Sequence, residues 1–140
     1  MITFDTALAQ VLKSEGGYVN DPNDPGGETN LGISRHSYPD VDIANLTPAL
    51  VAPIYKRDYW DKIGGDLLPS PLNYVAFDCA VNQGVSVAMR LLQDTIVPTR
   101  YIQLRLARYR ALPGWGRYGA GWASRLIDVL CFAMESYSCH

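Results

Sequence analysis

A run rich in glycine, proline, asparagine and aspartate near the amino terminus most constrains what this chain can fold into. The run extends from Gly16 to Gly32 and directly follows the first segment with helical periodicity. Glycine and proline interrupt helices, and the Asn-Asp-Pro and Asp-Pro-Gly-Gly sequences within the run favour turns. We therefore expect residues 18–34 to form turns and short extended pieces, which together make a small β-hairpin lobe.

The rest of the chain has the periodicity of helices, so the expected fold class is mainly α. Phe4, Leu8 and Val11 recur at helical spacing. The two glycines that follow Glu15 end this helix, which leaves Glu15 in its last turn. A second helix is expected to begin at a Thr47 cap and to extend to about residue 62. Further helices are expected over about residues 72–82, 86–96, 99–112 and 121–135, with a loop over residues 113–119.

Length and composition exclude several classes of protein. At 140 residues the chain has the length of a single domain, residues 1–140. No apolar run approaches the roughly 18 residues of a membrane span, so stable membrane insertion is not expected. The start lacks the basic segment and long apolar core of a signal peptide, and we expect synthesis in the cytoplasm. The net charge of −2 disfavours nucleic acid as a partner.

The cysteines and histidines predict neither a metal site nor a redox site. The cysteines are odd in number and lack zinc-type spacing, so we expect Cys79, Cys131 and Cys139 to be reduced. His36 and His140 lie too far apart in the sequence for a metal cluster, and His140 is expected in a solvated tail. No metal ion and no organic cofactor is therefore expected.

Basic side chains are concentrated in one segment of the chain. Residues 95–127 contain six arginines and no acid, whereas residues 1–94 contain 6 basic and 12 acidic side chains. Such a segment can bind an anionic polymer, or its arginines can cover apolar surface and pair with the acidic amino-terminal part. We favour pairing, and the arginines concerned are Arg100, Arg105, Arg108, Arg110, Arg117 and Arg125.

Glu15, Asp24 and Thr29 supply the functional groups that glycosidic bond hydrolysis needs. A carboxyl group at a helix C-terminus faces the negative end of the helix dipole, and partial burial against aromatic side chains raises its pKa further. Glu15 then suits the role of general acid, while Asp24 orients water or stabilises positive charge and Thr29 holds that water. Alternatively, Glu15 is a solvated helix end and Asp24 only a turn former.

Five segments of the chain carry a family resemblance. Residues 15–33 are Glu-Gly-Gly-Tyr-Val-Asn-Asp-Pro-Asn-Asp-Pro-Gly-Gly-Glu-Thr-Asn-Leu-Gly-Ile. The later segments are Ile54-Tyr-Lys-Arg-Asp-Tyr-Trp60, Phe77-Asp-Cys-Ala-Val-Asn82-Gln-Gly84, and Arg105-Leu-Ala-Arg-Tyr-Arg with Gly121-Trp-Ala-Ser-Arg125-Leu-Ile-Asp128. In this order they strongly resemble glycoside hydrolase family 108, N-acetylmuramidases found as phage endolysins and as proteins of the secretion-activator type.

The resemblance implies a lysozyme-like helical domain with the β-hairpin lobe after the first helix. It implies cleavage of the β-1,4 bond between N-acetylmuramic acid and N-acetylglucosamine, with Glu15 as the essential acid. The order Glu15, Asp24, Thr29 is similar to the phage-type lysozyme triad, although the spacing between Asp24 and Thr29 is one residue shorter. The implied partners are peptidoglycan glycan strands and a holin or export partner, through which the enzyme would reach the cell wall in the periplasm.

Three further side chains are candidates for substrate binding: Tyr18, Asp78 and Asn82. Tyr18 follows the acid closely and is expected at the wall of the cleft. Asp78 and Asn82 lie one helical turn apart. They either face the cleft and hydrogen-bond the glycan, or form a buried polar pair that ties their helix to the Asp24 turn.

The carboxy-terminal part departs from the family's pattern. Family members usually carry a longer segment, resembling a peptidoglycan-binding domain, where this chain has only residues 94–100. We therefore distinguish a catalytic part, residues 1–93, from carboxy-terminal helices, residues 99–140. The helices expected over residues 86–96 and 99–112 should then be nearly continuous across the shortened hinge. Such a hinge favours a domain-swapped homodimer. The alternatives to a muramidase are a catalytically weak wall-binding or secretion-assisting protein and a lytic transglycosylase.

Overall fold

The chain folds into helices with one small sheet, and both follow from local sequence. The computed structural model describes residues 1–138; Cys139 and His140, with the expectations made for them, lie outside this range. Its elements are α1 (Phe4–Leu12), β1 (Val19–Asn20), β2 (Glu28–Asn30), β3 (Ile33–Ser34), η1 (Ile43–Asn45), α2 (Pro48–Tyr55), η2 (Lys56–Trp60), η3 (Asp61–Ile63), α3 (Leu72–Gln83), α4 (Val85–Asp94), α5 (Pro98–Ala111) and α6 (Trp115–Ser138). The expected class, mainly α with a small β lobe after the first helix, is confirmed.

Helix α1 ends earlier than its sequence suggests. The Thr3 side chain accepts a hydrogen bond from the backbone N–H of Thr6 and so caps the start of the helix. The last helical residue is Leu12, and the N–H of Glu15 donates to the Leu12 carbonyl at 3.2 Å. Glu15 therefore lies in the turn that follows the helix rather than in the last helical turn.

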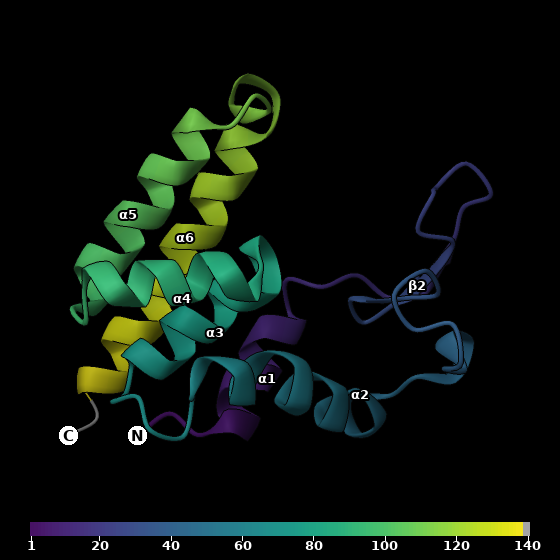
Figure 1. Cartoon of the computed structure of the whole chain (residues 1–140), viewed down its shortest axis with the longest axis horizontal. Helices are drawn as coiled ribbons and strands as arrows, with labels where there is room; N and C mark the ends of the chain where they lie inside the picture. Colours follow the sequence, from purple (N-terminus) through teal and green to yellow (C-terminus); the bar gives the residue numbers. More distant parts are fainter. Residues whose placement is uncertain (139–140) are drawn as a thin grey trace.

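The turn-rich run forms a three-stranded antiparallel sheet with β2 in the middle. Thr29 of β2 lies opposite Val19 on one side and Ser34 on the other. The side-chain amide of the buried Asn30 donates to the Ile43 carbonyl at 3.0 Å, which attaches the sheet to η1. In Figure 1 this lobe stands beside the helical body, at the opposite side from α5.

The second helical segment begins and ends where the sequence predicts. The Thr47 side chain accepts from the Leu50 N–H at 3.3 Å, as expected for an N-cap. Beyond α2 the helix continues as a π-helical turn, η2, and a 3₁₀ turn, η3. It ends at Gly64, whose φ of +68° suits glycine.

The first residues of α6 were expected to be a loop, and that expectation is wrong. The helix begins at Trp115 rather than near residue 121. Glycines in this segment lower helix propensity by about 1 kcal/mol each. They also allow close aromatic packing: a Cβ on the buried Gly119 would lie 2.6 Å from the Trp115 ring. Trp122 in turn stacks on Tyr109 with ring centroids 5.2 Å apart, so tertiary packing outweighs propensity.

The expected near-continuity of the helices around the hinge is also wrong. Helix α4 ends at Asp94, and Thr95 has an extended backbone with φ −161°. The Thr95 hydroxyl accepts from the Val97 N–H at 3.0 Å, and Pro98 begins α5. The chain therefore changes direction here, and α5 packs side by side with α6 (Figure 1).

An aromatic core fixes α1 against η2 and α3. The ring centroids of Phe4 and Trp60 are 5.5 Å apart, and those of Trp60 and Phe77 are 5.3 Å apart. Trp60 and Phe77 are buried, and Tyr55 completes the cluster with an edge-on contact to Phe77. Because α1 is held by this core, the turn that carries Glu15 has a fixed starting point. Among residues 1–138, no helix is long and apolar enough to cross a membrane.

Candidate active site

Glu15 lies where the turn after α1 meets the hairpin turn between β2 and β3. The N–H of Leu31 donates to the Gly16 carbonyl at 3.0 Å. The Tyr55 hydroxyl donates to the Leu31 carbonyl at 2.9 Å, so helix α2 secures the same hairpin turn from its other side. These two hydrogen bonds bring the hairpin backbone directly against the Glu15 side chain.

The hairpin turn requires glycine at position 32 for two reasons. Leu31 and Gly32 have positive φ angles of 50° and 78°, which is the geometry of a two-residue I′ hairpin turn. A Cβ at Gly32 would overlap the Tyr55 hydroxyl and would lie 3.0 Å from Glu15 Oε2. Gly32 therefore lets the hairpin, Tyr55 and Glu15 approach one another.

The surroundings of Glu15 raise its pKa. Its side chain is half-buried, and burial is the largest cause of the increase because it disfavours the charged form. The nearby positive charge of Arg125 opposes the increase, and the negative charge of Asp78 adds to it. On the opposite side of the acid, burial and the Glu15 charge raise the pKa of the Tyr55 hydroxyl, which stays neutral. A carboxyl group that keeps its proton towards neutral pH can act as a general acid.

Asp78 is buried among arginines. Its carboxylate lies 2.8 Å from Arg105 Nη1 and 3.0 Å from Arg125 Nη2. Arg125 Nη1 lies 3.7 Å from Glu15 Oε1. These two arginines therefore pair with acids of the amino-terminal part, as favoured from the sequence. Asp78 has arginine partners rather than the Asp24 turn, and it reaches Glu15 through Arg125.

Asn82 is exposed at the end of α3, one turn beyond Asp78. Its side-chain oxygen accepts hydrogen bonds from the Tyr109 hydroxyl and, at 3.4 Å, from Arg105 Nη2. Tyr109 stacks on Trp122 at the start of α6. These contacts to α5 hold the Asn82 side chain through its oxygen. The amide nitrogen of the same side chain is a hydrogen-bond donor.

Asp24 occupies the exposed turn between β1 and β2. Its Oδ1 accepts from the Gly26 N–H at 2.8 Å, and its carbonyl accepts from the Gly27 N–H at 3.0 Å. This segment protrudes from the sheet away from the helical body (Figure 1). The hydrogen bonds of Asp24 are those of a turn former, whereas Glu15 lies at the junction with the helices. The structure therefore does not gather Asp24 into the immediate surroundings of Glu15.

Thr29 and Tyr18 lie on the β lobe. Thr29 is half-buried at the centre of the sheet and belongs to the opposite face from Glu28, its neighbour in β2. The Tyr18 hydroxyl donates to Glu28 Oε2 at 2.8 Å, and Glu28 forms an ion pair with Arg35 at 2.6 Å. Tyr18 is 48% exposed, so its ring is available on the surface of the lobe.

The surroundings of Glu15 include three residues that sequence reasoning did not single out as site residues: Gly32, Tyr55 and Arg125. Each lies inside a segment that carries the family resemblance. For Gly32 and Tyr55 that was the signal, and for Arg125 the expected pairing of the arginine-rich segment with the acidic amino-terminal part was a second one. Their proximity to Glu15 depends on the packing of α2 and α6, which no local pattern encodes.

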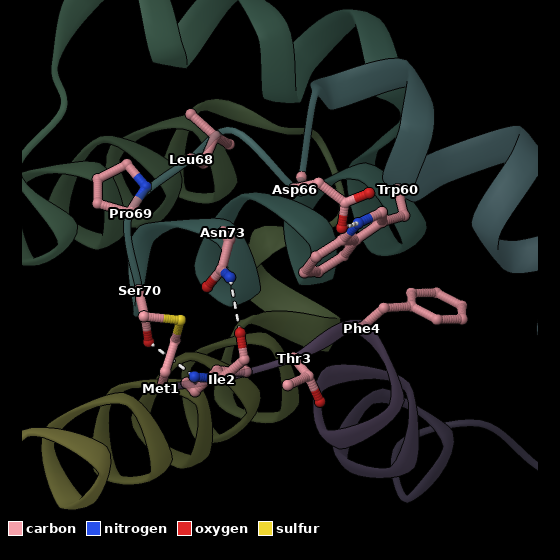
Figure 2. Close-up of a pocket in the computed structure, with 11 residues that line it drawn as sticks. Met1, Ile2, Thr3, Phe4, Trp60, Asp66, Leu68, Pro69, Ser70 and Asn73 are labelled. Carbon is pink, nitrogen blue, oxygen red and sulfur yellow. Dashed lines mark hydrogen bonds between the residues drawn. The ribbon is translucent and has the colours of Figure 1, made fainter.

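A separate pocket of about 350 Å³ lies beside the amino terminus, between the start of α1 and the segment before α3 (Figure 2). There the Ile2 N–H donates to the Ser70 hydroxyl at 3.0 Å, and the Asn73 amide donates to the Ile2 carbonyl at 2.8 Å. The Trp60 indole donates to Asp66 at the far end of the pocket. These contacts fix the chain start, and none of the lining residues belongs to the surroundings of Glu15.

A mainly helical domain with a half-buried acid at its junction with a small β lobe has the features of a glycoside hydrolase. The chain belongs to the Glycosyl hydrolase 108 family, whose model matches residues 8–84. The fold is similar to the structure of Brucella abortus SagA, with a TM-score of 0.77 and 29% sequence identity. That similarity covers 94% of this chain and 94% of the other. No curated protein matches the chain.

These comparisons confirm the resemblance and the lysozyme-like fold class stated from the sequence. The family match includes the candidate residues Glu15, Asp24 and Thr29, but it ends before α5 and α6. The structural similarity extends over nearly the whole of both chains, so the carboxy-terminal helices belong to the shared fold.

Proposed function

We propose that this chain is a peptidoglycan hydrolase that cleaves the β-1,4 bond between N-acetylmuramic acid and N-acetylglucosamine. Membership of the Glycosyl hydrolase 108 family supports hydrolysis of a glycosidic bond. The observation that carries the proposal is Glu15, a half-buried carboxyl group of raised pKa at the junction between the helices and the β lobe. In this proposal Glu15 donates its proton to the glycosidic oxygen as the bond breaks.

The backbone beside Glu15 is open to a polymeric substrate. Apart from the adjoining residues of the chain, no heavy atom of residues 1–138 lies within 4 Å of where a Cβ on Gly16 or Gly17 would stand, so a sugar chain can approach this turn closely. Tyr18 and Asn82 are proposed to contact the glycan through an exposed ring and a side-chain amide. Asp78 is proposed to act indirectly, because its carboxylate is occupied by two arginines.

The roles of Asp24 and Thr29 follow the family resemblance. Asp24 lies outside the immediate surroundings of Glu15, so its proposed role, to stabilise the oxocarbenium-like transition state or to activate water, requires a substrate that reaches from the β lobe to the helices. Thr29 is proposed to position that water. Both lie on the β lobe, so the substrate would be held between the lobe and the helices. No metal or organic cofactor enters this proposal.

The biological setting is also part of the proposal. Glycan strands of the cell wall are the proposed substrate, and a holin or an export partner would release the enzyme from the cytoplasm into the periplasm. We further propose that the short connection between α4 and α5 permits a domain-swapped homodimer. Size-exclusion chromatography with light scattering tests this, and a monomeric mass at all concentrations would refute it.

The function is tested by digesting purified sacculi and identifying the products by mass spectrometry. Wild type should release fragments with reducing muramic-acid ends, and Glu15→Gln should be at least ~10²-fold slower because it lacks the proton. Glu135→Gln is the matched control, since Glu135 is an exposed acid on α6. Anhydro sugar products would instead identify a lytic transglycosylase. Intact sacculi that retain the wild-type protein would identify a wall-binding protein.

A further inference from the structure

A ladder of alternating charges leads from the buried interior of the helices to the acid. Its members are Arg105 of α5, Asp78 of α3, Arg125 of α6 and Glu15. The exposed fractions of these side chains are 0%, 1%, 15% and 21% in that order. The ladder therefore begins in the interior and ends at the accessible carboxyl group.

We propose that Arg125 is a positioning residue for Glu15. Asp78 and Arg105 hold the Arg125 guanidinium in place, and its positive charge then balances the Glu15 carboxylate that remains after proton donation. This inference rests on the proposed role of Glu15 as an acid. It assigns the carboxy-terminal helices a role at the candidate active site, although they lie beyond the family match at residues 8–84.

The distances show how Arg125 is shared between two acids. Its Nη2 lies 3.0 Å from Asp78, whereas its Nη1 lies 3.7 Å from Glu15. The closer partner fixes the guanidinium, since Asp78 is itself anchored by Arg105 at 2.8 Å. The longer contact is still within ion-pair distance, so the guanidinium favours the charged form of Glu15, although burial outweighs this effect on the Glu15 pKa.

The charge balance of the ladder favours proton donation. With Glu15 protonated, two arginines face a single carboxylate, so the cluster carries one uncompensated positive charge. Loss of the Glu15 proton makes the cluster neutral. Because an uncompensated charge is costly in a partly buried cluster, the ladder assists the step in which the acid becomes an anion.

The groups that face Glu15 come from several elements. Arg125 approaches from α6 and Asp78 from α3, and the tyrosines Tyr55 and Tyr59 approach from α2 and η2. Both tyrosines have raised pKa values and stay neutral, so Arg125 is the cation and Asp78 the anion that act on Glu15. Burial raises the Glu15 pKa, Arg125 lowers it and Asp78 raises it.

The test is a titration of the Glu15 carboxyl carbon by ¹³C NMR, without substrate, in wild type and in two variants. Arg125→Gln removes the positive charge and should raise the Glu15 pKa by about one unit. Asp78→Asn removes a negative charge and frees Arg125 for Glu15, so it should lower the pKa. A purely structural network would reduce stability in both variants without shifting the titration in opposite directions.

Two further variants keep the test decisive. Arg125→Lys retains the charge and should leave the Glu15 titration near that of wild type. Arg117→Gln is the matched control, because Arg117 lies on the same helix with its guanidinium over the Tyr118 ring. If Asp78→Asn does not fold, the two Arg125 variants still test the inference. An unchanged Glu15 titration in Arg125→Gln overturns the inference.

The pH profile of sacculus digestion supplies the functional readout. Activity falls as pH rises through the Glu15 pKa, so the alkaline limb should move to higher pH in Arg125→Gln. The rate at low pH should also fall, since the product carboxylate has lost its counter-charge. The titration needs no turnover: inactive wild type with shifted titrations would refute the proposed function alone, whereas normal activity with an unshifted titration would refute this inference alone.

Discussion

Replacement of Gly32 by alanine tests the close approach that forms the site. The φ of +78° at this position costs a residue with a Cβ about 1–2 kcal/mol. The new methyl group would also overlap the Tyr55 hydroxyl and lie 3.0 Å from Glu15 Oε2. Displacement of that hydroxyl leaves the Leu31 carbonyl without its hydrogen bond, at a further cost of about 1–3 kcal/mol.

The expected total is therefore about 2–5 kcal/mol of unfolding free energy. For a chain of this size such a loss lowers Tm by roughly 10 °C. Activity should fall by more than the loss of folded protein explains, because the Glu15 carboxyl group must move. Thermal unfolding followed by circular dichroism and sacculus digestion below Tm measure the two effects separately.

Gly64 provides the matched control. It has a similar φ of +68°, but within the described part of the chain no heavy atom of a non-adjoining residue lies within 4 Å of its Cβ position. Gly64→Ala should therefore cost only the backbone part, about 1–2 kcal/mol, and leave activity unchanged. In a Tyr55→Phe background the overlap disappears, so the additional cost of Gly32→Ala should approach that of Gly64→Ala. Equal costs for the two glycine variants in wild type would refute the close approach.

Three further predictions follow from the ionic and polar contacts. The folded-state pKa of Glu15 is raised, so the protonated Glu15 side chain stabilises the folded protein. This stabilisation is fully present below the unfolded pKa of about 4.3 and is lost as pH rises through the folded pKa. Because glutamine cannot ionise, the Tm of Glu15→Gln relative to that of wild type should increase as the pH is raised from 4 to 8, and thermal melts measure this difference. Arg105→Leu leaves the buried Asp78 with one partner and should cost about 3–5 kcal/mol in urea unfolding, whereas Arg110→Leu on the exposed face of α5 should cost little. Tyr18→Phe keeps the exposed ring and should retain sacculus binding, while Tyr18→Ala should weaken it in a pull-down assay.

Local signals account for the parts of the fold that were predicted correctly. The helix cap at Thr47 depends on the side chain of one residue and the N–H of Leu50 nearby, so it is visible in the sequence. The same holds for the helix end at Gly64 and for the turn-rich β lobe. Where propensity and packing conflict, as in the glycine-rich start of α6, the sequence alone gave the wrong helix boundary.

The candidate acid was identifiable because its motif is continuous in the chain. Glu15 is followed directly by the glycines and turns that expose it, and this order also carries the family resemblance. Its neighbours are discontinuous: Tyr55 comes from α2, and Arg125 comes from α6. Periodicity predicts that these residues lie in helices, but it does not predict which helices pack against the acid.

The sequence by itself determined the class of fold, the position of the β lobe after the first helix and the choice of Glu15 as the candidate acid, since each depends on residues close together in the chain. Only the tertiary structure decided what surrounds that acid. Burial, the fit of Gly32 against Tyr55, and the ladder from Arg105 to Glu15 arise when distant helices pack. Because the pKa of a carboxyl group depends on its solvation and on nearby charges, its chemistry is fixed only when those helices are in place.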